Sequence, residues 1–512
     1  MQYRTSTNNY TKRPLGNPSP SEGGGCPQDG RGSMKSLAKD TAIYGISSIV
    51  GKFLNYLLVP LYTYVLQNTS DYGIVTNLYA WTALLLVILT YGMETGFFRF
   101  ANKEGEDAAS VYKTSFYTLL TTSAAFAIIC VLLRAPIAAG LGYEGHASFI
   151  AMMAITVALD AFSSIPFAYL RYQKRAVSFA ILKLLFVVLN IAFNLIFLIV
   201  LGWQDVTYVF VSNILATVIQ TVILLFFTLP RGGRYSMPLL REMLRYSLPL
   251  LVLGIAGIMN QTLDRILFPY LYTGADAQAQ LGIYGACFKV AMVMMMFTQA
   301  FRYAYEPFVF AKHKDRQSVE AYADAMKYYI IFSFLILLGV VVYLDIFKYI
   351  IGSMYWEGLR IVPVVLWTYV FQGVYFNLSF WYKLTDQTKW GAYFSLIGLA
   401  ITLVLQILGV PRIGYWASCG SSLVCYFVIM LLSYFVGRKH LAVPYDLKRI
   451  GAYTLITCGL LAIYYGARNL LGNMWWSMAV GTILIGIYCG ILIKFDFHVF
   501  RNRRSNGSSR EN

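Results

Sequence analysis

The sequence predicts an all-α polytopic membrane protein with about fourteen transmembrane helices, arranged as two six-helix lobes related by an internal repeat plus two C-terminal helices. Three observations support this fold class. The chain is 58% hydrophobic and only 13% charged, which is typical of a polytopic membrane protein. Apolar runs of about 20 residues, the length that crosses the hydrocarbon core, recur along the chain. A stretch of 34 residues also returns without a gap 209 positions later.

The predicted spans follow one another with short connections. They cover residues 41–66, 72–95, 111–133, 147–170, 177–201, 206–229, 246–272, 282–305, 328–347, 361–382, 390–410, 415–436, 451–467 and 475–493. The domains that follow are a disordered cytoplasmic tail (1–40), an N-lobe (41–229), a cytoplasmic linker (230–245), a C-lobe (246–436), a two-span segment (437–494) and a basic cytoplasmic tail (495–512). The second half of the linker, MPLLREMLR, has the pattern of a short amphipathic helix on the membrane surface. Either Met1 or Met34 could be the first residue of the protein.

The distribution of positive charge predicts the orientation. With the N-terminus inside, the predicted cytoplasmic segments and their flanks carry 32 of the 41 lysines and arginines, and the outside loops carry 5. Because Lys and Arg are retained on the cytoplasmic side, both termini are expected in the cytoplasm. The net charge of +17 is therefore explained by lysines and arginines in the cytoplasmic segments. We predict no nucleic-acid partner.

The repeat pairs residues 41–74 with residues 250–283, and eight of the 34 positions are identical. Pro60 matches Pro269, and Gly73 matches Gly282. An even number of spans in each lobe gives both copies the same orientation, and we expect the substrate site of such a fold to lie between the repeats. Since proline removes a backbone hydrogen bond from a helix, we expect hinges at Pro60 and Pro269.

Four cations fall inside predicted spans: Lys52, Lys183, Arg265 and Lys289. A cation at a helix centre costs about 2.5–3.5 kcal/mol on insertion scales, so it usually faces the bundle interior or a wet cavity. Arg binds phosphate with a two-pronged fork and Lys binds it as a point charge. We therefore predict a cationic cavity between the lobes. The alternative for Lys183 and Lys289 is that their long stems reach back to the membrane surface.

Carboxylates inside the spans are fewer. Asp160 and Asp264 lie in the fourth and seventh predicted spans, and Glu94 and Glu306 lie near the cytoplasmic ends of the second and eighth. A carboxylate in a low-dielectric site can exchange a proton near neutral pH, so these four are candidates for coupling to H⁺ or Na⁺. The alternative is that Asp160 pairs with a lysine and Asp264 neutralises its neighbour.

Tyr56 and Tyr62, close to Lys52, are candidates for stacking on sugar rings, while most other aromatics fit interfacial belts. The seven cysteines form no CxxC pair and the four histidines are scattered. The sequence therefore predicts neither a disulfide framework nor a metal site. No cofactor is predicted apart from a coupling ion.

The segment GKFLNYLLVPLYTYVLQNTSDYGIVTNLYA, followed by YGMETGFFRFA, resembles the N-terminal region of bacterial polysaccharide exporters, the Wzx-type O-antigen and capsule-unit flippases. The architecture over 34–494 resembles the multidrug/oligosaccharidyl-lipid/polysaccharide (MOP) exporter superfamily and is similar to that of the lipid II flippases. This resemblance implies a protein of the bacterial inner membrane that moves an undecaprenyl-pyrophosphate-linked oligosaccharide to the periplasmic leaflet by alternating access. It implies cavity or gate cations at Lys52, Arg265 and Arg99, and a lipid tail accommodated by the two extra spans.

The sequence features bear on three functions. The leading one is a flippase without chemical catalysis, whose partners are the lipid-linked oligosaccharide, membrane lipids and other polysaccharide assembly proteins. The first alternative is a lipid II, lipid or drug exporter of the same superfamily; a drug exporter would be expected to line its cavity with carboxylates. The second alternative is a membrane-bound polysaccharide polymerase, which needs a long outside loop. No predicted outside loop exceeds about fifteen residues.

Overall fold

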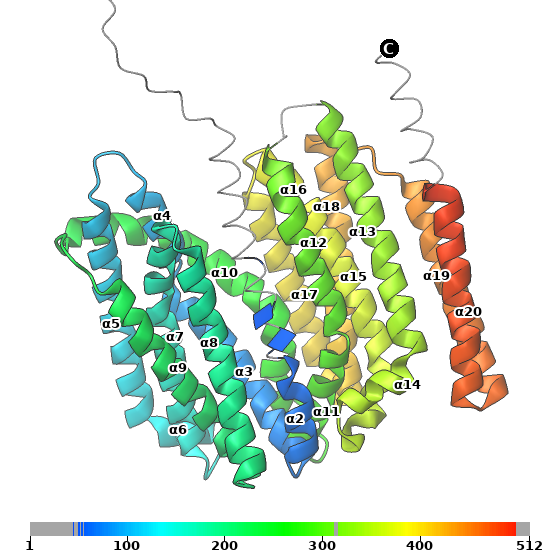
Figure 1. Ribbon diagram of the computed structural model, residues 1–512, viewed down its shortest axis with the longest axis horizontal. Coiled ribbons are helices and arrows are strands. Elements are labelled where there is room, and N and C mark those ends of the chain that lie inside the picture. The colour runs from blue at the N-terminus through cyan, green and yellow to red at the C-terminus, as the bar shows by residue number, and fades with distance from the viewer. Residues whose placement is uncertain (1–44, 46–49, 52, 55, 312–315, 498–512) are drawn as a thin grey trace, which may run out of the picture.

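The computed structural model describes residues 45, 50–51, 53–54, 56–311 and 316–497 (Figure 1). Every regular element in these residues is a helix. Twelve helices are long and apolar enough to cross a membrane, and a bent helix pair makes a thirteenth span. The predicted all-helical polytopic fold is therefore confirmed. The first predicted span lies partly outside the described residues, and its described end is α2 (Leu58–Val65).

The first bundle occupies the blue to green half of Figure 1. Besides α2 it contains α3 (Thr69–Thr90), α4 (Met93–Ala101), α5 (Ala108–Leu132), α6 (Arg134–Gly140), α7 (Ala147–Tyr172), α8 (Ala176–Leu195) and α9 (Val206–Thr228). The helices begin where the sequence supplies caps: the carboxylate of Asp107 accepts hydrogen bonds from the first turn of α5, and Asp205 does the same for α9. Tyr91 and Gly92 have φ angles of 33° and 70°, and this left-handed turn separates α3 from α4.

Helix α10 (Met237–Leu271) joins the two bundles as one continuous helix of 35 residues. The predicted linker helix is present, but it is not a separate short helix: MPLLREMLR is the first part of α10. The physical reason is that no proline or glycine lies within 239–248, and the helix continues through Pro249, which lacks a backbone N–H. The first part of α10 packs in an apolar cluster with α4 and α5, through Leu240 and Met243. Its later part contacts the second bundle, where Asn260 Nδ2 donates to the carbonyl oxygen of Ser395 at 2.8 Å.

The second bundle follows α10. It contains α11 (Ala277–Val290), α12 (Met292–Ala311), α13 (Arg316–Val342), α14 (Leu344–Phe347), α15 (Val362–Leu378), α16 (Phe380–Leu384), α17 (Lys389–Ile413) and α18 (Tyr415–His440). A short 3₁₀ turn, Lys348–Ile350, and a longer 3₁₀ segment, Ser353–Ile361, precede α15. The eighth predicted span is broken: α11 and α12 meet at Ala291 with a bend of 46°.

Helices α19 (Leu447–Leu471) and α20 (Met474–Leu492) form a hairpin at the edge of the second bundle in Figure 1. Two tyrosines attach this hairpin to α13. Tyr488 Oη donates to the carbonyl oxygen of Ile331 at 2.9 Å, and Tyr464 Oη donates to that of Val342 at 3.1 Å. The hairpin therefore belongs to the side of the molecule that holds the second bundle.

The two bundles meet where α3 crosses α11. Gly73 and Gly282 lie at this crossing, and neither has room for a side chain. Beside them, Ser70 Oγ donates to the carboxylate of Asp276, which also caps the start of α11. This crossing closes the end of the molecule near residues 66–68, which we call the first-loop end.

Candidate functional site

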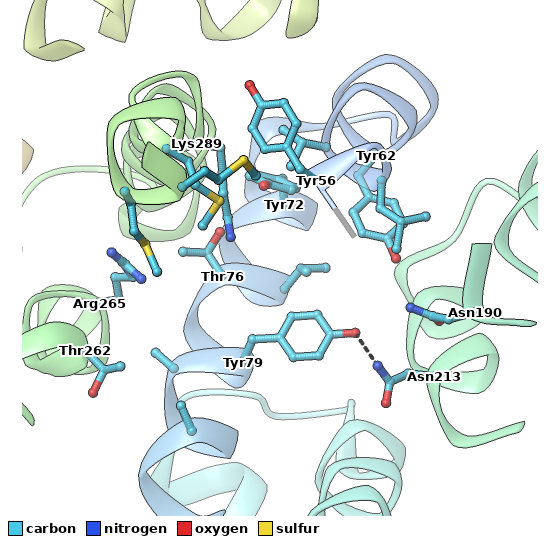
Figure 2. Close-up of a pocket in the computed structure, with 18 of the residues that line it drawn as sticks. Tyr56, Tyr62, Tyr72, Thr76, Tyr79, Asn190, Asn213, Thr262, Arg265 and Lys289 are labelled. Carbon is cyan, nitrogen blue, oxygen red and sulfur yellow. Dashed lines mark hydrogen bonds between the residues drawn. The ribbon is translucent and has the colours of Figure 1, made fainter. Parts of the chain in front are cut away.

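A cavity of about 390 Å³ lies between the two bundles (Figure 2). Helices α2, α3, α8 and α9 form one wall, and α10, α11 and α12 form the other. The lining residues are Tyr56, Leu58, Val59, Tyr62, Tyr72, Val75, Thr76, Tyr79, Ala80, Ala83, Asn190, Asn213, Thr262, Arg265, Lys289, Met292, Met295, Met296 and Gln299. The cavity therefore lies between the two copies of the repeat, where the sequence predicted the substrate site.

Arg265 and Lys289 are the only charged residues among the described residues that line the cavity. The guanidinium carbon of Arg265 lies 4.3 Å from the centre of the Phe288 ring, an arrangement that favours a cation over an aromatic face. Its Nε is buried without a hydrogen-bond partner. The guanidinium thus retains unused donor capacity beside the cavity.

Lys289 is in the last turn of α11, and Figure 2 shows its ammonium group directed into the cavity above Thr76. Within the described part of the chain, no carboxylate forms an ion pair with it. A positive charge in a partly apolar cavity without a counter-ion favours the binding of an anion. Arg265 and Lys289 together give the wall formed by α10 and α11 a net positive charge.

Asp264 points away from this cavity. Its carboxylate is 4% exposed and accepts a hydrogen bond from Tyr284 Oη at 2.5 Å. Arg265 Nε is 3.9 Å from Asp264 Oδ2. Because adjacent residues project about 100° apart on a helix, the carboxylate is directed into the second bundle while the guanidinium lines the cavity.

Lys183 and Asp160 lie in the first bundle and do not line the cavity. The ammonium group of Lys183 is 3.9 Å from the centre of the Phe167 ring. Asp160 and Lys183 interact electrostatically, without an ion pair within 4 Å in the described residues. The predicted ladder of four cations is therefore reduced, among the described residues, to two cations in the cavity and one outside it.

The charged residues of α4 also lie outside the cavity. Glu94 forms an ion pair with Arg171 of α7. The guanidinium of Arg99 lies 4.1 Å from the centre of the Tyr246 ring, on the surface where α4 meets α10. Arg99 is therefore placed at a junction of α4 with the connecting helix and not among the cavity cations. Lys52 and the side chain of Glu306 lie outside the described residues.

Tyr56 and Tyr62 both line the cavity. The hydroxyl group of Tyr56 is buried without a hydrogen-bond partner, and Tyr62 is 5% exposed. Pro60 and Pro269 lie inside α2 and α10. The break beside the cavity lies elsewhere, at Ala291, within two residues of Lys289.

Two asparagines of the first wall were missed by the charge-based prediction. Asn213 Nδ2 donates to Tyr79 Oη at 3.2 Å, and Asn190 faces the cavity from α8 (Figure 2). The sequence could have indicated them, because an asparagine inside an apolar span also has a polar side chain that needs a hydrogen-bond partner. Charge alone could not reveal them.

Hydrogen bonds hold the first-loop end of the cavity together. Asn77 Nδ2 donates to the backbone carbonyl of Arg265 at 2.7 Å, and Tyr143 Oη donates to Asn77 Oδ1 at 2.8 Å. Gln278 Nε2 donates to Tyr143 Oη at 3.3 Å. These hydrogen bonds link α3 to α10 and α11, and the one from Asn77 holds the backbone at Arg265.

Residues 37–305 match the family model described as polysaccharide biosynthesis protein, which is just over half of the 512 residues. Among curated proteins, subunit I of the A-type ATP synthase of Pyrococcus abyssi (strain GE5 / Orsay) is 27% identical over 128 residues, covering 22% of this chain and 18% of that subunit. The chain therefore spans less than a fifth of that relative, and this similarity carries no argument about function.

Solved structures show the same fold. The lipid II flippase MurJ in its inward-closed conformation has a TM-score of 0.70 at 13% identity, covering 88% of this chain and 99% of that one. An inward-facing multidrug resistance transporter of the MATE family, in the MOP superfamily, has a TM-score of 0.62 at 13% identity, with 78% and 95% covered. At such identities the similarity shows the fold alone.

Proposed function

Because this chain belongs to the polysaccharide biosynthesis protein family and has the fold of MOP-superfamily transporters, we propose that it is a flippase for an undecaprenyl-pyrophosphate-linked oligosaccharide. It transfers this substrate from the cytoplasmic to the periplasmic leaflet of the bacterial inner membrane by alternating access. Both termini are in the cytoplasm, and no covalent bond of the substrate is broken. The observation that carries the proposal is the pair Arg265 and Lys289 in the cavity between the bundles.

The chemistry of a pyrophosphate fits this pair. A pyrophosphate carries several negative oxygens close together, so it can accept a two-pronged hydrogen bond from a guanidinium and a further contact from an ammonium group. Arg265 has a buried Nε that makes no hydrogen bond, although Asp264 Oδ2 lies 3.9 Å from it, and Lys289 has no ion pair in the described residues. The described lining contains no Asp or Glu, which disfavours a cationic drug as the substrate.

A second cavity supports a lipid substrate. It has a volume of about 470 Å³ and lies between α13, α15, α18 and α19. Its lining is almost entirely apolar: Met326, Ile330, Phe334, Trp367, Val370, Phe371, Val374, Leu378, Phe427, Met430, Leu431, Tyr434, Phe435, Tyr445, Leu447, Ile450 and Thr454. A polyprenyl tail buries a large apolar area, and such a groove would shield it beside the appended hairpin.

Asp264 is the better placed of the two aspartates for coupling transport to H⁺ or Na⁺. It is buried next to Arg265, so a change in its charge acts directly on the cationic wall. Asp160 interacts electrostatically with Lys183 and with the lining residue Tyr79, so it lies behind the wall opposite to Arg265 and Lys289. The lipid II flippase fold is shared, and lipid II also contains a polyprenyl pyrophosphate, so the head-group sugar distinguishes that alternative from the leading function.

The test is complementation. The chromosomal gene is deleted in the source bacterium, and plasmids supply wild type, Arg265→Gln, Lys289→Gln or Arg412→Gln, the last a control on an exposed residue outside both cavities. We expect wild type and the control to restore surface polysaccharide. Both cavity variants should insert at normal levels, measured by immunoblotting of membranes, and should lose most surface polysaccharide. Normal polysaccharide from both cavity variants would overturn the proposal.

A further inference from the structure

The repeat places equivalent residues on the two facing walls of the cavity, and these residues have diverged in charge. Shifting by 209 positions pairs Arg265 with Tyr56 and Lys289 with Ala80. All four residues line the cavity. The fold therefore supplies two comparable walls, but in the described residues only the wall of α10 and α11 presents positive charge.

The opposite wall presents neutral hydrogen-bonding groups. Figure 2 shows Asn190 and Asn213 on the side of the cavity opposite to Arg265 and Lys289, with the ring of Tyr79 extending toward Asn213. Asn190 Oδ1 accepts a hydrogen bond from Asn194 Nδ2 at 3.2 Å. Among the described residues nothing accepts from Asn190 Nδ2, so its N–H groups remain available to a ligand.

Tyr79 and Asn213 provide the other half of this wall. The hydroxyl oxygen of Tyr79 accepts from Asn213 Nδ2 at 3.2 Å, which leaves the phenolic proton free to donate into the cavity. Amides and phenols are both donors and acceptors, and they match sugar hydroxyl groups, which are also both. They match a pyrophosphate less well than the opposite wall does, because they carry no positive charge to offset its negative oxygens.

We propose that the cavity is divided into two subsites, with the pyrophosphate on the wall of Arg265 and Lys289 and the first sugar on the wall of Asn190, Asn213 and Tyr79. This inference rests on the proposed function and adds the residues that would distinguish one glycan from another. The substrate then bridges the two bundles, and the sugar-binding residues determine which lipid-linked glycan is accepted. A bare polyprenyl pyrophosphate occupies only one wall.

The experiment measures binding to the full-length protein purified in lipid nanodiscs. The probes are undecaprenyl pyrophosphate and a panel of undecaprenyl-pyrophosphate monosaccharides that carry glucose, galactose or N-acetylglucosamine. The variants are Asn213→Leu, which keeps the side-chain size, and Tyr79→Phe, which keeps the ring. Lys289→Gln tests the opposite wall. Asn260→Leu is the control, because Asn260 is a buried asparagine that donates to Ser395 and does not line the cavity.

We expect wild type to bind at least one glycosylated probe more tightly than the bare pyrophosphate. Asn213→Leu and Tyr79→Phe should weaken that probe roughly three- to tenfold, the loss expected for one hydrogen bond, and change the bare probe less than twofold. Lys289→Gln should weaken both probes, and the control should bind as wild type does. Equal weakening of both probes by the first-wall variants, or no gain from any sugar in wild type, would overturn the two subsites and leave the proposed function intact. Failure of wild type to bind any probe would instead contradict the proposed function and the subsites with it.

Discussion

Gly73 and Gly282, which the repeat places at equivalent positions, pack against each other where α3 crosses α11. A Cβ added to Gly73 would collide with the carbonyl oxygen of Gln278, and one added to Gly282 would collide with the carbonyl oxygen of Thr69. Thr69 and Gln278 are themselves equivalent in the repeat, 209 positions apart. The contact is therefore two-fold symmetric, and in both copies the obstacle is backbone that cannot rotate out of the way.

Alanine at either glycine should force α3 and α11 apart. We expect Gly73→Ala and Gly282→Ala each to cost about 1–3 kcal/mol in the conformation described, the usual penalty of overpacking, and to shift the protein toward a state open at the first-loop end. Thermal unfolding of purified protein, together with maleimide labelling of a Thr76→Cys reporter from outside the cell, measures both effects. Gly257→Ala is the matched control, since no atom lies within 4 Å of its added Cβ. Labelling no faster than in wild type would contradict the prediction.

Phe288 should be needed for the position of Arg265. Phe288→Leu keeps an apolar side chain but removes the ring under the guanidinium, whose attraction is about 0.5–2 kcal/mol. We expect the affinity for undecaprenyl pyrophosphate to fall by up to about thirtyfold, with normal membrane insertion. Binding in nanodiscs measures this change, and Phe226→Leu, on an exposed part of α9, serves as control. An affinity equal to that of wild type would show that the ring does not position Arg265.

Asp264→Asn should make the rate of transport independent of the coupling ion. The substitution preserves the shape of the side chain and its oxygen acceptor for Tyr284, but it fixes the charge at zero. In proteoliposomes we expect flipping by this variant to be insensitive to an imposed H⁺ or Na⁺ gradient, whereas Asp160→Asn keeps the response of wild type. Lectin binding to glycans that reach the opposite leaflet reports the rate. A gradient response equal to that of wild type in Asp264→Asn would remove Asp264 from the coupling mechanism.

Filling the second cavity should impair transport of the full lipid. Val374 of α15 lines that cavity, and Val374→Trp would occupy space that a polyprenyl tail needs. We expect slower flipping of a substrate with a long tail and little change for one with a short farnesyl tail. Val404→Trp is the control, because Val404 is 53% exposed on α17 and outside the cavity. Equal slowing of both substrates would point to a general packing defect.

The sequence was sufficient for most of the fold because the length and hydropathy of each span depend only on the residues along the chain. It was insufficient at α10, where the linker sequence continues the helix and no local signal marks a boundary. The sequence places Arg265, Lys289 and Lys183 alike inside predicted spans. Whether each side chain faces the cavity depends on the rotation of its helix, and that is set by packing against neighbours. Arg265 and Lys289 line the cavity, while Lys183 packs on Phe167.

The difference in charge between the two walls has a consequence for how such a protein could arise. Two identical half-length chains assembled about a two-fold axis would place the same residues on both walls, so a mutation to arginine on one wall would also appear on the other. Joining the copies in a single polypeptide removes that constraint. Tyr56 and Ala80 can then differ from Arg265 and Lys289, so the cavity has one charged and one neutral wall, an arrangement that two identical chains related by a two-fold axis could not form.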